Sequence, residues 1–160
     1  MTRFALLSAL LALSGALARA DEAKGEKVDS TTYDAYFEKN NSGLKGDASY
    51  LAFAGQDGFG KVFAARPPLM GGKKPVLLPP GAFDKQLVAA VIKRGNSITT
   101  YKVEKVTKEG DTLYVQYKAD SGPAGTATFA SPLIVSAPKE GVKKVAFIEN
   151  GKAAGTAEVK

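Results

Sequence analysis

Six apolar residues in succession, LVAAVI at positions 87–92, say most about the fold of this chain. Val and Ile are β-branched and favour strands over helices. An apolar run that is not interrupted by polar residues indicates a strand covered on both faces. The stretch therefore predicts a central β-strand with packed layers on either side.

The residues that follow this run keep a β pattern. Leu113, Val115 and Tyr117 alternate with polar positions, as in a half-buried strand. Asn150-Gly151 separates two strand-like runs, which is the strongest short signal for a β-hairpin. Pro132 falls inside an expected strand at 126–137, which places it at an edge, a bulge or a break, because proline cannot donate to a ladder. These patterns predict an antiparallel meander of five to six strands.

The N-terminal side predicts a strand at 50–54 and then a short helix within 56–65. Phe59, Val62 and Phe63 share one helical face. Gly58 and Gly60 each weaken that helix by roughly 1 kcal/mol relative to Ala. The predicted fold class is α+β, mostly β: a short N-terminal strand and helix followed by the antiparallel sheet.

The first twenty residues have the layout of a secretory signal peptide. A basic start at Arg3, an apolar run at 4–17 and the ending Ala18-Arg19-Ala20 are typical of a cleavable leader. The apolar run is shorter than the ~20 residues that span a bilayer. We expect a signal peptide at 1–20, a flexible mature N-terminus at 21–32 and one globular domain at 33–160. The protein is then exported to the periplasm or beyond, without a membrane anchor in the mature chain.

The composition argues against the common kinds of catalysis. The chain has no Cys and no His, so Ser–His and Cys–His pairs are excluded. Ser97, Ser131 and Ser136 remain as candidates for a Ser–Lys pair, but surface Ser and Lys residues are the simpler interpretation. Residues 55–61 fit G-x-x-x-x-G-K, yet Val62 stands where a phosphate loop needs Ser or Thr. We expect a non-enzymatic protein without cofactor or metal; an unrecognised hydrolase is the last alternative.

Candidate contact residues for a protein partner come from the aromatic and proline positions. Tyrosine is favoured at protein interfaces, although core packing is the simpler role for most aromatic residues. The candidates are Tyr36, Tyr50, Tyr101, Tyr114 and Pro132. The net charge of +6 comes mainly from Lys and favours a second interpretation, a binder of anionic envelope polymers. The sequence has no Arg-rich stripe, so we do not expect it to bind nucleic acid.

Residues 92–150 resemble the C-terminal domain of the PrcB-like family, which is named for a protein that supports a secreted protease complex. The resemblance follows the order of elements: Gly95 to Tyr101-Lys102-Val103, then 111–115, the Thr-rich 126–129, Pro132 with its β-branched followers, and 143–147. In the family, Thr-Gly-Gly usually precedes the tyrosine, whereas Ile98-Thr99-Thr100 stands here. The resemblance implies an interaction module that assists an extracytoplasmic protease or envelope complex.

Overall fold

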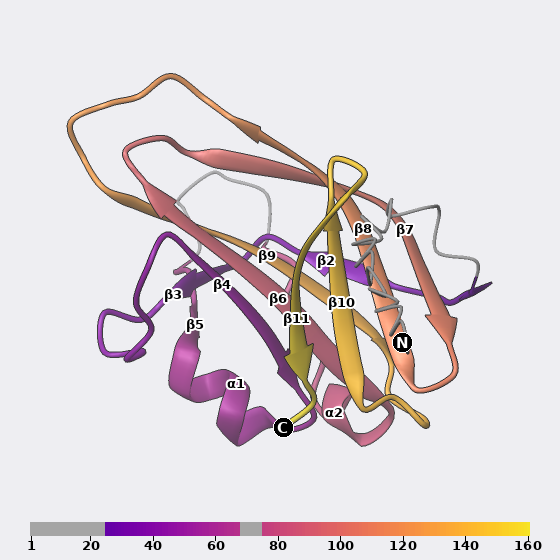
Figure 1. The fold of residues 1–160 in the computed structure, drawn as a ribbon. Coiled ribbons are helices and arrows are strands. Elements are labelled where there is room, and N and C mark those ends of the chain that lie inside the picture. The colour runs from indigo at the N-terminus through magenta and orange to yellow at the C-terminus, as the bar shows by residue number, and fades with distance from the viewer. Residues whose placement is uncertain (1–24, 68–74) are drawn as a thin grey trace, which may run out of the picture.

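The computed structural model describes residues 25–67 and 75–160, which form a mostly β fold (Figure 1). The predicted signal peptide at 1–20 lies outside the described residues. A five-stranded sheet has the order β1-β7-β8-β10-β11. Its strands are β1 (Glu26–Lys27), β7 (Thr99–Glu109), β8 (Thr112–Ser121), β10 (Lys144–Glu149) and β11 (Lys152–Glu158).

A four-stranded sheet packs against the first and has the order β2-β9-β6-β4. It consists of β2 (Thr31–Tyr33), β9 (Phe129–Pro138), β6 (Gln86–Gly95) and β4 (Ala48–Phe53). A small outer layer holds β3 (Tyr36–Glu38), paired with β5 (Phe63–Ala65), and helix α1 (Gln56–Val62). Helix α2 (Ala82–Lys85) directly precedes β6.

The four-stranded sheet is buried on both faces, as the apolar run at 87–92 predicted. Leu87, Ala89 and Val91 of β6 belong to the core between the two large sheets. The alternate residues Val88 and Ile92 belong to a second core beneath α1 and the small sheet. Because side chains alternate across a strand, only an apolar residue at every position satisfies both cores.

The predicted fold class is confirmed, with 55% of the described residues in strands and 9% in helices. The strands do not form one continuous meander, however. β9 leaves the five-stranded sheet for the four-stranded one, so β10 returns beside β8 and pairs with it in parallel. β9 carries apolar residues on both faces, including Ile134 and Val135, and only the doubly covered sheet buries them all.

The polar segment at 21–32, which the sequence predicts to be flexible, contributes to two short strands, β1 and β2. β1 pairs with β7, and β2 pairs with β9 from Thr31 opposite Ser136 to Tyr33 opposite Ile134. Paired structure therefore begins before Tyr33. Composition did not indicate these strands because they are held by backbone hydrogen bonds at sheet edges, with most of their side chains exposed.

Several local predictions are confirmed. Asn150 and Gly151, with φ of 50° and 77°, form the hairpin turn between β10 and β11. Pro132 lies on a local edge, because β2 covers β9 only as far as Ile134. Helix α1 buries Phe59 and Val62 as predicted, but it ends at Val62, so Phe63 begins strand β5 and does not continue the helical face.

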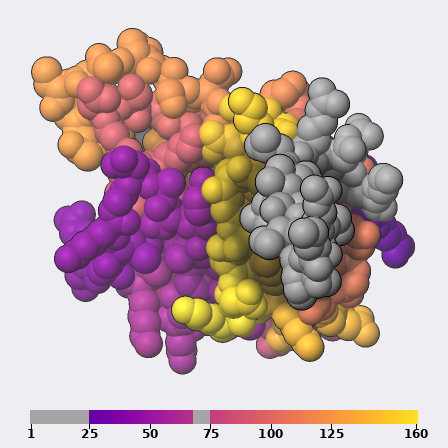
Figure 2. Space-filling model, in the orientation of Figure 1, coloured from indigo at the N-terminus to yellow at the C-terminus, as the bar shows by residue number. Residues whose placement is uncertain are grey.

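The opposite side of the sandwich is closed by the C-terminal residues. Ala54 N donates to Lys160 O at 2.6 Å, and Lys160 N donates to Ala52 O at 3.3 Å. The space-filling view shows the C-terminal strand lying against the N-terminal part of the fold (Figure 2). On the side formed by β7 and β9, residues 26–33 cover only part of the two strand edges, and the candidate site lies there.

Candidate functional site

One side of the sandwich is closed along only half of its length. Residues 26–33 cross from the edge of β7 to the edge of β9, with Val28 N donating to Val106 O at 3.1 Å on the way. After Tyr33 the chain leaves for β3. The first half of β7 and the first half of β9 are therefore left without this cover.

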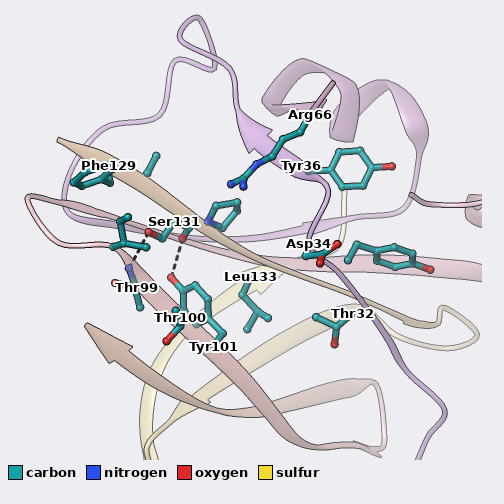
Figure 3. A pocket seen from close by; sticks show the side chains of 14 residues that line it. Thr32, Asp34, Tyr36, Arg66, Thr99, Thr100, Tyr101, Phe129, Ser131 and Leu133 are labelled. Atoms are coloured by element: carbon teal, nitrogen blue, oxygen red, sulfur yellow. Dashed lines mark hydrogen bonds between the residues drawn. The ribbon is translucent and has the colours of Figure 1, made fainter. Parts of the chain in front are cut away.

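An open cavity of about 540 Å³ occupies the uncovered half, and we call it the seam cavity (Figure 3). Its walls come from three places: residues 32–36 with Arg66, the start of β7 at 98–101, and the start of β9 at 129–133. Segments far apart in the sequence thus meet at one site.

The floor of the seam cavity is fixed by Ser131. Its hydroxyl accepts a hydrogen bond from Thr99 N at 3.0 Å, and its carbonyl accepts one from the Tyr101 hydroxyl at 2.8 Å. Both bonds are drawn in Figure 3. Burial raises the pKa of the Tyr101 hydroxyl, so it stays protonated and remains a donor at neutral pH. This floor joins β7 of one sheet to β9 of the other.

The rim of the cavity combines apolar and charged groups. Ile98 is 54% exposed and Phe129 is partly exposed. Ile98 lies where two connections project side by side from the end of the sandwich: Gly122 N donates to Ile98 O at 2.9 Å, and Gly125 N donates to Asn96 O at 2.7 Å (Figure 1). Arg66 and Asp34 contribute one charge of each sign.

The structure brings together three of the five predicted contact residues. Tyr36, Tyr101 and Pro132 all line the seam cavity. Tyr36 contributes little chemistry there, because its hydroxyl accepts a hydrogen bond from Leu78 N at 3.0 Å and its ring packs edge-on against Phe59 in the core. Tyr101 and Pro132 belong to the two uncovered half-strands themselves.

The other two predicted residues lie elsewhere. Tyr114 is on β8 and points away from the core that its neighbours Leu113 and Val115 enter. Tyr50 is on β4, with its ring 5.4 Å from that of Phe147, and lines a separate cavity of about 410 Å³ beside Lys93 and Glu149. The five tyrosine and proline positions therefore do not form one surface.

Sequence reasoning missed Arg66 and Ile98 as site residues. Arg66 directly precedes Pro67-Pro68 in a segment without periodicity, and Ile98 reads as the first residue of a strand. The sequence offers Ser131 as a candidate nucleophile, whereas its hydroxyl serves as a hydrogen-bond acceptor in the floor. A single sequence has no signal for these roles, because they arise from contacts between the two sheets.

Comparison with protein-family models, with curated proteins and with solved structures found no match for this chain. Within residues 25–67 and 75–160, no helix is long and apolar enough to cross a membrane. In the same residues, no group of three or more acidic side chains is placed to hold a metal ion.

Proposed function

We propose that this protein is a non-enzymatic, exported interaction module that binds another extracytoplasmic protein at the seam cavity. The observation that carries the proposal is the half-closed side of the sandwich. There, uncovered parts of β7 and β9 meet an apolar rim at Ile98 and Phe129. Sheet edges that lack a neighbour are common sites for the addition of a partner strand.

The hydrogen bonds of the Ser131 and Ser136 hydroxyls favour a binding role over catalysis. Ser131 accepts a hydrogen bond from a backbone amide, and Ser136 is buried and bonded to the Tyr33 hydroxyl at 3.1 Å. Neither hydroxyl is hydrogen-bonded to a lysine in the described part of the chain. A Ser–Lys nucleophile needs that arrangement.

Two features of the sequence support the extracytoplasmic setting. Residues 1–20 have the pattern of a cleavable leader. The likeness of residues 92–150 to the PrcB-like family suggests a protease or another envelope complex as the partner. The seam cavity lies largely within that stretch, since β7 and β9 provide two of its walls.

Capture from an extract tests the proposal. Residues 21–160 are immobilised as wild type, as Ile98→Asp and as Val76→Asp, and exposed to an envelope extract of the source organism. Val76 is a matched control, because it is 52% exposed and does not line the seam cavity. We expect one protein to remain on wild type and Val76→Asp through a high-salt wash and to be lost from Ile98→Asp.

Other outcomes contradict the proposal. If all three forms retain the partner equally, the contact lies outside the seam cavity. If no protein is retained, the proposed role as an interaction module is contradicted. Release of all material at high salt favours the lysine-dependent binding of anionic polymer, because salt screens exposed charges. Hydrolysis of a generic protease, esterase or glycosidase substrate favours the enzyme alternative.

A further inference from the structure

The backbone of β7 presents unpaired hydrogen-bonding groups to the seam cavity. Ile98 O accepts from Gly122 N on the β8 side, whereas Thr99 N points the other way and donates to Ser131. The N–H and C=O of one strand residue point to the same side, and successive residues alternate. The backbone groups of Tyr101 and Val103 therefore face the same side as those of Thr99, away from β8.

A bulge in β7 confirms this assignment. The pairing with β8 shifts between Val103 and Lys105, which changes the residues that face the edge. Val106 then faces the edge, as its carbonyl shows by accepting from Val28 N. The unpaired window is the edge of β7 between Thr99, whose N–H is bonded to Ser131, and Val106, whose carbonyl is bonded to Val28. Within it, no hydrogen bond from the described chain reaches the backbone of Tyr101 or Val103.

The side chain of Arg66 supplies a cation to the same cavity. Its backbone N donates to Ala35 O at 2.7 Å, which fixes the residue beside β3. Its guanidinium forms no ion pair with any carboxylate among the described residues, including Asp34. In Figure 3 the guanidinium points towards the Ser131 and Phe129 end of the cavity, whereas Asp34 lies at the Thr32 end. A carboxylate that binds near Phe129 can therefore pair with the Arg66 guanidinium, which has no acidic partner among the described residues.

We propose that the partner docks an extended segment whose backbone pairs with Tyr101 and Val103 and whose Asp or Glu side chain binds Arg66. This inference rests on the proposed function and names the chemistry of the partner. Guanidinium and carboxylate form strong paired hydrogen bonds. Because side chains of an extended segment alternate, residues beside the acidic one are free to contact Ile98 and Phe129.

A phage-displayed library of random octapeptides tests the inference on the wild type, on Arg66→Glu and on Lys152→Glu. Lys152 is an exposed lysine outside the seam cavity and serves as the charge-reversal control. We expect wild type and Lys152→Glu to enrich peptides with Asp or Glu at one fixed position. The dissociation constant of the best synthetic peptide should rise at least ~10-fold for Arg66→Glu. Thermal melts check that each variant is folded.

Hydrogen exchange adds a readout that does not depend on a variant. The same peptide should slow exchange of the Tyr101 and Val103 amides. The inference is overturned if no peptide is enriched, if the enriched peptides show no acidic position, or if these two amides are unaffected. A partner that is lost from Ile98→Asp but binds Arg66→Glu normally overturns this inference while leaving the proposed function intact.

Discussion

The hydroxyl of Tyr117 on β8 donates a 3.0 Å hydrogen bond to the Glu149 carboxylate on β10. The other oxygen of Glu149 binds the ammonium of Lys93, which comes from β6 in the facing sheet. One carboxylate thus joins three strands of two sheets. Tyr117 is fully buried, and Glu149 provides the hydrogen-bond acceptor for its hydroxyl. This cluster helps to hold together the two sheets between which the seam cavity lies.

Substitution of Tyr117 by Phe tests the strength of that connection. The variant loses a hydrogen bond to a charged group, so we expect the free energy of unfolding to fall by about 1–2 kcal/mol. Tyr114→Phe is the matched control on the same strand and should change it by less than about 0.5 kcal/mol. Urea denaturation measures both. Equal effects of the two substitutions would contradict the role given to Glu149.

Alkaline pH should destabilise the protein through Tyr101 and Tyr117. Burial, followed by the nearby charge of Glu149, raises the pKa of both hydroxyls above the ordinary value of 10.0. The unfolded chain then loses these protons first, so stability is intact below about pH 10 and falls as the pH rises beyond it. Near-ultraviolet titration should show these two of the six tyrosines ionising only on unfolding. Tyr117→Phe should reduce the slope of stability against pH, and an unchanged slope would contradict the assignment.

Gly155 on β11 is required by the ring of Tyr50. A Cβ at this position would lie 2.3 Å from Cδ2 of Tyr50. We expect Gly155→Ala to lower the free energy of unfolding by about 1–3 kcal/mol, because the ring has to move against its neighbours. Gly95→Ala is the control, since no atom lies within 4 Å of a Cβ there, and should stay within about 0.5 kcal/mol. A neutral Gly155→Ala would show that β4 and β11 pack less closely than described.

Native-state hydrogen exchange tests the unpaired window of β7. The amides of Thr100 and Lys102 face β8, whereas those of Tyr101 and Val103 face away from β8. We expect the second pair to exchange faster than the first by more than about 10-fold. Uniform protection along residues 100–103 would mean that the edge of β7 is already paired.

The strands were predictable from the sequence where a local pattern of apolar or turn residues marks them. The run at 87–92 indicated a doubly covered strand, and Asn150-Gly151 indicated the last hairpin. The division of the strands between two sheets was not predictable from local pattern. The parallel contact of β10 with β8 is decided by which sheet buries both faces of β9.

The site was predictable only in part. Tyr101 and Pro132 were singled out and do meet at the seam cavity, and Tyr36 lies beside them. Arg66 and Ile98 carry no local pattern, because their role depends on the point at which residues 26–33 stop covering the two edges. Tyr50 and Tyr114 share their residue type with Tyr101, but their strands place them on other surfaces.

The most direct test of the account is to map the partner's footprint by nuclear magnetic resonance. The captured protein is added to isotopically labelled residues 21–160, and the amide signals that shift are assigned. The account predicts that the largest shifts fall at residues 98–103, 129–133 and Arg66, around the seam cavity. Shifts that instead surround Tyr50 and Lys152, or follow exposed lysines across the surface, would contradict it.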